Sequence, residues 1–384
     1  MFLEKTIEKN NKLIEAGTDL YKKNLLLPDT YLVDVDNFLN NAKLILEKAN
    51  EDNIKLYFML KQLGRNPYLA KKLVEIGYKG AVVVDFKEAQ IMMDNNIPLG
   101  NVGHLVQTPK HLIKKIMKYG TEVFTVYSFE KLKEINESAI ELNMVQDVII
   151  KVSGKDDIFY SGQLSGIELD DLKDFISKSS ELSNINIIGV TAFPCYKYSE
   201  ETNKIEKTNN YYTVEKACVI MKQQGIKVTH INTPSTTSIL TLEQMKNDIG
   251  NVGEPGHGFT GSTPAHANND LVEIPSVIYI TEISHNFRGK SYCYGGGHYR
   301  RSHVKNCLVV DDNPHISNIN KIEDDSIDYY FELDGEEKIS SPAIMAFRFQ
   351  IFVTRSNVVL IEGVNTGNIK IVGRYNTLGG VTNE

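Results

Sequence analysis

Residues 227–261 read KVTHINTPSTTSILTLEQMKNDIGNVGEPGHGFTG. The β-branched run Lys227–Asn232 is typical of a strand, and the five hydroxyl residues of Thr233–Ser238 precede a helical pattern, ILTLEQMKN. Hydroxyls at this position cap a helix N-terminus, and together with unpaired N–H groups they also suit an anion. Gly253–Gly261 follows with four glycines, which permit a phosphate to approach the backbone closely. Simple capping and an ordinary glycine-rich loop remain the alternatives.

The same alternation of strand and helix extends from Tyr31 to Gly258. Eight short β-branched runs are the strand candidates: Tyr31–Val35, Lys55–Leu60, Gly80–Val84, Asn101–Leu105, Glu122–Tyr127, Asp147–Val152, Ile185–Val190 and Lys227–Asn232. Alternating strands and helices indicate right-handed βαβ units and a parallel sheet. About eight units favour an α/β fold of the (β/α)8 TIM-barrel type. An open Rossmann-like sheet is the alternative, but no GxGxxG follows the first strand.

After about Asp270 the helical patterns stop. The strand candidates there are Ser276–Ile283, Ser291–Tyr294, Lys305–Val310, Asp328–Leu333, Arg348–Val353, Asn357–Glu362 and Asn368–Val372. Strands in succession predict an antiparallel β domain. The first 24 residues fit an amphipathic helix. We therefore expect an N-terminal helical extension over 1–27, a barrel over 28–270 and a C-terminal β domain over 271–384.

The composition narrows the class of protein. The chain has 384 residues and a net charge of −7, and no basic run alternates with aromatics, so nucleic acid is not an expected partner. No stretch approaches the roughly 20 apolar residues of a membrane span, and the charged N-terminus does not resemble a signal peptide. The four cysteines form no CxxC pair, which favours the cytoplasm over a disulfide framework or a zinc site.

Lys61 closes the second predicted strand, in YFMLKQLGRNP. The four preceding residues are apolar, and a lysine that ends a buried strand is costly unless it is paired or used chemically. Burial lowers the pKa of such an amine, which suits Schiff-base formation. A surface lysine at the start of a loop is the plain alternative. With the two phosphate-type segments, Lys61 suggests a phosphorylated cofactor.

Two further features have open interpretations. Tyr292–Arg301, YCYGGGHYRR, fits either a polar hairpin tip or a catalytic loop. Four histidines in the second half match no metal-ligand spacing, so we expect no metal site. They are His257, His266, His298 and His303.

The motifs around Lys61, TPSTTS and GEPGHG resemble those of fold-type III pyridoxal 5'-phosphate (PLP) enzymes. That group includes alanine racemase, the ornithine- and diaminopimelate-type decarboxylases and D-serine dehydratase-like proteins. The stretch EPGHGFTGSTPAHA is similar to the YhfX-like branch. The resemblance implies that Lys61 carries PLP as a Schiff base. It also implies a set of phosphate-binding residues, namely Ser235, Thr236, Thr237, Gly256, His257 and Tyr375.

Two positions depart from alanine racemase. Glu254 stands where racemases have an arginine facing the pyridine nitrogen, as in the decarboxylase EPG segment. A carboxylate there keeps the ring protonated and strengthens it as an electron sink. Ala192 replaces the histidine that stacks on the ring, and Phe193 or Phe159 is a substitute.

The group on the opposite face of the cofactor is also open. Racemases present a tyrosine of a YG pair from the partner subunit, which Tyr294 matches, whereas decarboxylases present a cysteine, which Cys293 matches. Neighbouring strand residues point to opposite faces, so we expect only one of them at the site and favour Tyr294.

The resemblance implies an amino-acid racemase or epimerase, acting at Cα through an external aldimine and a quinonoid. It also implies a homodimer with shared active sites and a small amino-acid substrate. The alternatives are a PLP decarboxylase, a D-amino-acid lyase, a PLP-binding carrier or a sugar-phosphate barrel enzyme. Five arginines are equally good candidates for the substrate carboxylate, namely Arg288, Arg300, Arg301, Arg348 and Arg355.

Overall fold

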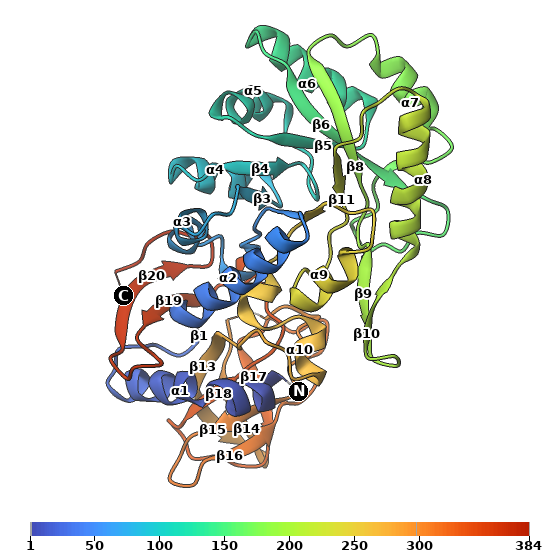
Figure 1. Cartoon of the computed structure of the whole chain (residues 1–384). Helices are drawn as coiled ribbons and strands as arrows, with labels where there is room; N and C mark the ends of the chain where they lie inside the picture. The colour runs from blue at the N-terminus through green and yellow to red at the C-terminus, as the bar shows by residue number, and fades with distance from the viewer. Residues whose placement is uncertain (1, 297, 384) are drawn as a thin grey trace. The chain divides into compact units, whose positions relative to one another are not determined.

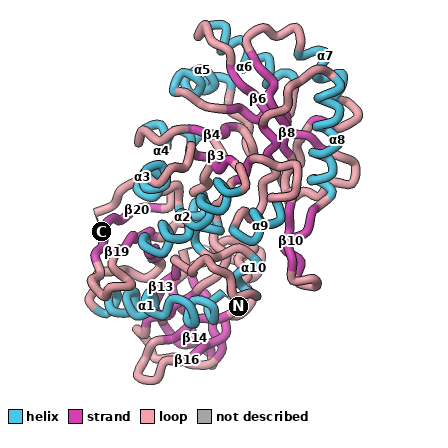
Figure 2. The backbone as a smooth tube through the Cα atoms, viewed as in Figure 1, coloured by secondary structure: helices cyan, strands magenta, loops and turns pink. Residues whose placement is uncertain are grey.

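The structure is a computed structural model that describes residues 2–296 and 298–383. It divides into two compact units, each described here by itself. The barrel unit comprises Leu44–Leu60 and Ala70–Gly256. The sheet unit comprises Met1–Lys43, Lys61–Leu69 and His257–Glu384. Figures 1 and 2 show their helices and strands.

The barrel unit is built on eight parallel strands among the described residues. They are β2 (Lys55–Leu56), β3 (Ala81–Val83), β4 (Leu99–Val102), β5 (Val123–Val126), β6 (Gln146–Ser153), β8 (Ile185–Thr191), β11 (His230–Asn232) and β12 (Val252–Gly253). From β3 onward each strand pairs with the next in this order, and β12 pairs with β2. A bridge between Phe58 and Ala81 closes the ring between β2 and β3. The predicted (β/α)8 barrel is confirmed.

Helices connect the barrel strands. They are α4 (Phe86–Asp94), α5 (Lys110–Tyr119), α6 (Phe129–Glu141), α7 (Leu172–Ser179), α8 (Asn209–Gln223) and α9 (Ile239–Met245), with α2 (Val35–Glu51) and α3 (Pro67–Glu75) crossing the division between the units. Short side chains cap two of them: Asp85 accepts from the N–H of Glu88, and Ser128 from that of Lys131. Strand β7 (Ile167–Glu168) pairs with β6, and β9 (Tyr196–Ser199) forms a hairpin with β10 (Lys204–Lys207).

Strands β4 and β5 are buried at every position, as expected for parallel strands covered on both faces. Tyr57 packs with Val82 and Val252 in a buried cluster. A Cβ atom at Gly100 would lie 2.2 Å from the Tyr57 ring, so only glycine leaves room for this tyrosine.

The sheet unit contains the C-terminal strands, as predicted. Its sheet has the order β16 (His315–Asn318), β15 (Asn306–Val309), β18 (Pro342–Met345), β13 (Val277–Phe287), β1 (Thr30–Asp34), β19 (Asn357–Glu362) and β20 (Lys370–Asn376). Strand β14 (Lys290–Tyr294) pairs with β13 and with β17 (Tyr330–Asp334). All these pairs are antiparallel except that of β1 with β19. The remaining elements are α1 (Phe2–Lys22), α10 (Pro264–Asn268), and the 3-10 turns η1 (Lys61–Leu63), η2 (His257–Thr260) and η3 (Ile351–Val353).

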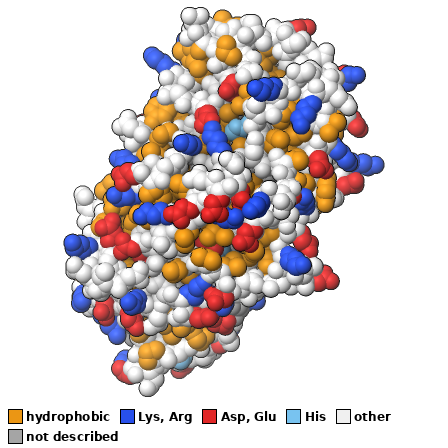
Figure 3. All heavy atoms as spheres, in the orientation of Figure 1, with side chains coloured by type: hydrophobic (Ala, Val, Ile, Leu, Met, Phe, Trp, Pro, Cys, Tyr) orange, Lys and Arg blue, Asp and Glu red, His pale blue; other side chains and the backbone are white. Residues whose placement is uncertain are grey.

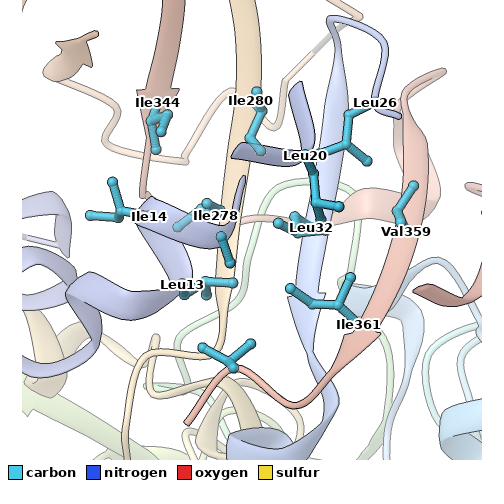
Figure 4. Close-up of a cluster of buried hydrophobic side chains, with 12 residues drawn as sticks. Leu13, Ile14, Leu20, Leu26, Leu32, Ile278, Ile280, Ile344, Val359 and Ile361 are labelled. Atoms are coloured by element: carbon cyan, nitrogen blue, oxygen red, sulfur yellow. The ribbon is translucent and has the colours of Figure 1, made fainter. Parts of the chain in front are cut away.

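The expected N-terminal amphipathic helix is present as α1, and its apolar face covers this sheet. Leu13, Ile14 and Leu20 of α1 join buried side chains from β1, β13 and β19 in one cluster (Figure 4). Removing this apolar surface from water stabilises the pairing of the N-terminal helix with strands from the far end of the chain.

The structure corrects two strand assignments. Tyr31–Val35 was expected to open the barrel, but Thr30–Asp34 lies in the sheet unit between β13 and β19. All five residues of β1 are buried, and such a run fits either sheet. The eighth barrel strand is instead Val252–Gly253, which is too short to give a pattern. Lys61 therefore follows the first barrel strand. Arg348–Val353 was also expected to be a strand, but residues 346–350 are irregular and Ile351–Val353 forms η3.

The two compact units do not follow the predicted linear ranges, because the segments 1–43 and 61–69 group with residues after 256. The ranges 1–27, 28–270 and 271–384 remain our proposal for the domain boundaries along the chain. Acidic and basic side chains are interspersed on the face drawn in Figure 3, so that face has no single-sign field.

Candidate active site

A layer of polar side chains lies at the carboxyl end of the barrel strands. Asn101 (β4), Thr125 (β5), Lys151 (β6) and Asn232 (β11) are at most 2% exposed, and Glu254, just after β12, is 7% exposed. Buried polar groups in a barrel are costly unless they are hydrogen-bonded. The carboxyl ends of barrel strands are also where such folds carry their chemistry. This layer is therefore the first part of the candidate site.

Glu254 is held by neutral donors. Its Oε1 accepts hydrogen bonds from Asn232 Nδ2 at 2.6 Å and from Asn101 Nδ2 at 3.3 Å. Thr125 Oγ1 donates to Asn101 Oδ1 at 2.7 Å, which fixes the direction in which that amide points. The backbone N–H of Glu254 donates to Thr237 Oγ1 at 3.3 Å. Strands β4, β5 and β11 thus orient one carboxylate.

Lys151 is a second ionisable group of this layer. Its Nζ donates to Ser165 Oγ at 2.7 Å and lies 5.5 Å from the Tyr127 ring centre. Burial lowers the pKa of Lys151 to about 8, against the opposing effect of the Glu254 charge. The barrel therefore places an easily deprotonated amine within electrostatic range of the carboxylate.

The hydroxyl-rich turn between β11 and α9 has the character of an oxyanion site. Thr236 has a positive φ of 46°, a conformation that side chains rarely adopt. Its Oγ1 and that of Thr233 are buried and have no hydrogen-bond partner among the described residues. Ser235 is 9% exposed and Thr237 only 2%. Buried hydroxyls without partners fit a phosphate oxygen, whereas the Thr237 hydroxyl already holds Glu254.

Lys61 and His257 are covalently tied to adjacent barrel strands. The N–H of Met59 donates to the carbonyl of Pro255 at 3.0 Å, which continues the pairing of β2 with β12. Lys61 and His257 each follow this pair by two residues. Lys61 opens η1 and is partly buried. The charge of Lys61, after burial and the charge of Arg348, is one cause of a low His257 pKa, so the two residues are within electrostatic range of each other in the sheet unit.

The His257 side chain is enclosed by polar partners of the sheet unit. Its Nδ1 lies 3.0 Å from Ser262 Oγ, and its Nε2 lies 3.2 Å from Gln350 Nε2. Burial, followed by the charges of Arg348 and Lys61, holds the pKa of His257 well below its usual range. The imidazole is therefore neutral.

Tyr375, on β20, is 7% exposed, and burial raises its pKa. Its ring lies over Gly373, where a Cβ atom would be 2.5 Å away. Thr377, two residues on, is in van der Waals range of Gly64 at the end of η1. This places the end of β20 beside the Lys61 turn.

Tyr294 and Cys293 differ sharply in exposure. Tyr294 ends β14 and is 38% exposed, and its ring centre lies 5.9 Å from that of Tyr330. Cys293 is 0% exposed, and burial raises the pKa of its thiol to about 12. A protein-facing thiol of this kind is inert, whereas the tyrosine is accessible to another molecule.

Phe193 is flanked by other aromatic side chains of the barrel unit. Its ring centre lies 5.9 Å from that of His104 and 5.7 Å from that of Tyr160. Phe159 is in the same β6–β7 loop as Tyr160. These contacts leave both phenylalanines as candidates to cover a cofactor ring.

No group of three or more metal-ligating side chains occurs within residues 2–296 and 298–383. His266 is instead held by Thr263 at 2.7 Å and by Glu273 at 3.3 Å. None of the helices within the described ranges is long and apolar enough to cross a bilayer.

The residues present fit PLP. The barrel unit contains a fixed carboxylate that suits a pyridinium nitrogen and buried hydroxyls without partners among the described residues that suit a phosphate, and the sheet unit contains the Lys61 amine. The sequence did not reveal Asn101, Asn232 and Lys151. Their only sequence signal is that each is a polar residue in or at the end of a strand that otherwise looks apolar.

Comparison with known proteins identifies relatives along the whole chain. The family model for the alanine racemase N-terminal domain matches residues 33–264, and that for the YhfX-like C-terminal domain matches residues 278–371. The "Uncharacterized protein YhfX" of Escherichia coli (strain K12) is 41% identical over 382 residues, which cover 99% of each chain.

Solved structures share the fold at low sequence identity. D-threonine aldolase from Filomicrobium marinum has a TM-score of 0.67 and 13% identity, covering 91% of this chain and 94% of that one. Alanine racemase of Clostridium difficile 630 has a TM-score of 0.63 and 17% identity, covering 92% and 99%. The chain belongs to the alanine racemase N-terminal domain family, in its YhfX-like branch.

Proposed function

We propose that this protein is a PLP-dependent amino-acid racemase or epimerase that acts at Cα. When bound, PLP supplies an electron sink for the pair left at the Cα of an amino-acid substrate. The family and the cofactor-compatible groups of the barrel support the cofactor.

Glu254 has the task of keeping a negative charge at the ring nitrogen. Asn232 and Asn101 both donate to its Oε1, so the carboxylate cannot turn away without losing two buried hydrogen bonds. In this proposal Ser235 and Thr236 bind the phosphate through their hydroxyls, Gly256 and His257 through their N–H groups, and Tyr375 completes that site.

Inversion at Cα requires one group that removes a proton and another that returns it from the opposite side. We assign these tasks to Lys61 and to Tyr294 of the partner subunit, in a homodimer with shared active sites. The main support for assigning Tyr294 rather than Cys293 is that Tyr294 is 38% exposed whereas Cys293 is 0% exposed. An exposed phenol can reach a second chain, and a fully buried thiol cannot.

The test is incubation of the purified protein with L- and D-amino acids in deuterated water. A racemase incorporates deuterium at Cα and yields both enantiomers. Incorporation of deuterium without inversion, for every amino acid, would refute the two-group assignment.

A PLP decarboxylase or a D-amino-acid lyase is the second candidate, because Glu254 stands where decarboxylases of this fold also have a carboxylate. The same incubation separates these reactions. Carbon dioxide release indicates a decarboxylase, and an aldehyde or keto product indicates a lyase.

A further inference from the structure

The segment 347–350 of the sheet unit presents two polar side chains to the His257 ring. Phe347 and Phe349 both pack on Tyr31, with ring centres 6.2 Å and 6.0 Å away. Phe349 also packs on His257, with ring centres 5.6 Å apart, and the polar residues that alternate with the two phenylalanines act on the same imidazole. The Nε2 atom of Gln350 lies 3.2 Å from Nε2 of the imidazole, and the positive charge of Arg348 lowers the His257 pKa.

Both polar side chains have buried atoms without hydrogen-bond partners. Arg348 Nε and Gln350 Oε1 have no partner among residues 2–296 and 298–383. Gln350 is only 7% exposed. Leaving such donors and acceptors unmet costs about 1–3 kcal/mol each, so their arrangement points to a ligand that meets them.

The charge of Arg348 is also uncompensated. No carboxylate of the described residues lies within ion-pair distance of the Arg348 guanidinium. A partly buried guanidinium without a counter-charge is destabilising, and an anion would remove that cost.

Three other arginines of the sheet unit have polar partners of their own. Arg300 pairs with Asp328 at 3.1 Å, and Arg355 donates to the carbonyl of Gly295 at 3.3 Å. Arg374 donates to the carbonyl of Leu25 at 2.7 Å. Arg348 differs from these three by its unmet Nε atom, a feature that it shares with Arg65, whose guanidinium lies 5.2 Å from the Phe352 ring centre.

We propose that Arg348 and Gln350 form the subsite that binds the carboxylate of the amino-acid substrate. The planar guanidinium matches a carboxylate with two parallel hydrogen bonds. Turning the Gln350 amide by half a turn leaves its heavy atoms in place. Its oxygen then accepts from the Nε2–H of His257, and its NH2 faces the ligand.

The network around His257 is compatible with this amide orientation. With the proton on Nε2, Nδ1 can accept from the Ser262 hydroxyl at 3.0 Å, and Ser262 can accept from the Thr260 hydroxyl at 2.7 Å in place of the contact of that hydroxyl with the His257 carbonyl at 3.2 Å. His257 is therefore a positioning residue that fixes Gln350. This inference rests on the proposed function, which supplies the amino-acid substrate and the role of Lys61.

The phosphate of the cofactor is the other oxyanion in this chemistry. The buried hydroxyls Ser235 and Thr236 of the barrel unit suit it, and Thr236 Oγ1 is without a partner among the described residues. We therefore assign Arg348 to the substrate carboxylate, and the test distinguishes binding of this carboxylate from binding of the cofactor phosphate.

The experiment titrates the purified holoprotein with propionate, propionamide and inorganic phosphate by calorimetry. Propionate carries the carboxylate but no amino group, so it reports this subsite without turnover. Arg348→Met should weaken propionate binding roughly 10- to 100-fold. Arg348→Lys should recover part of the propionate affinity, because the positive charge remains but the two parallel N–H donors of the guanidinium are lost. Arg288→Met is the matched control, since Arg288 is exposed in the same unit.

Cofactor affinity, measured by equilibrium dialysis against PLP, should stay within about twofold in Arg348→Met. Released PLP with unchanged propionate binding would assign Arg348 to the phosphate and overturn the proposal. Unchanged binding of both would make Arg348 structural and overturn it as well. Gln350→Ala, which keeps all charges, should weaken propionate binding in the same direction and covers the case of an unfolded Arg348 variant.

A failure of the proposed function gives a different result from a failure of the carboxylate subsite. If the wild-type protein retains no PLP but still binds propionate through Arg348, the cofactor assignment is wrong and the carboxylate subsite stands. If PLP is retained and propionate does not bind, the subsite is wrong.

Discussion

Substituting Glu254 by glutamine removes a charge while keeping a shape. The oxygen of the new amide can still accept from Asn232 and Asn101, which lie 2.6 Å and 3.3 Å from Oε1. Folding and cofactor binding should therefore survive. The negative charge that stabilises a pyridinium is lost, and a loss of about 3 kcal/mol in the transition state slows the reaction at least ~100-fold. The assay is the rate of Cα proton exchange into deuterated water, followed by NMR, with cofactor content measured by absorbance.

Glu122→Gln is the matched control for this variant. Glu122 precedes β5 at the opposite, amino-terminal end of the barrel strands and pairs with Lys55, so its loss removes an equal charge away from the site. Exchange in the control should match the wild type. A wild-type exchange rate in Glu254→Gln, at full cofactor content, would refute the argument that the negative charge of Glu254 accelerates Cα proton exchange.

Three further predictions follow from burial and exposure. The folded-state pKa of Lys151, about 8, lies below the value of 10.5 expected when the chain unfolds, so this group makes the protein more stable as pH rises from 8 to 10.5. Lys151→Met should abolish that rise and add roughly 3 kcal/mol at pH 7, as measured by urea unfolding. Tyr294→Phe should slow racemisation at least ~100-fold. Cys293→Ser should leave the racemisation rate unchanged and lower the free energy of unfolding by about 1–3 kcal/mol. A slow Cys293→Ser variant beside a fully active Tyr294→Phe variant would assign the catalytic role to Cys293. Ser235→Ala with Thr236→Val should weaken PLP binding roughly 10- to 1000-fold in equilibrium dialysis, and unchanged affinity would place the phosphate elsewhere.

The sequence predicted the fold well because its patterns are local. A β-branched run, a capped helix and a turn follow each other along the barrel, and each is decided by a few neighbouring residues. The assignment failed where two distant partners compete for one strand. Thr30–Asp34 is buried on both faces and pairs with β13 and β19, which lie more than 240 residues away. No local pattern distinguishes this strand from a barrel strand.

The candidate site was predicted to the extent that its residues stand in motifs. Lys61, Ser235 and Glu254 lie in recognisable segments. Asn101 and Asn232 do not, because their importance comes from a shared hydrogen-bond acceptor on another strand. The choice between Tyr294 and Cys293 follows from strand alternation, but which of them is exposed depends on the packing of β14 against β13 and β17.

The central claim is that Lys61 carries the cofactor, and the barrel contains a rival amine in Lys151, whose pKa is about 8. Borohydride reduction of the purified protein followed by peptide mapping decides between them. The account predicts a reduced pyridoxyl label on Lys61, in the peptide LYFMLKQLGR, and its loss in Lys61→Ala. A label on Lys151, or no label on either lysine, would contradict it.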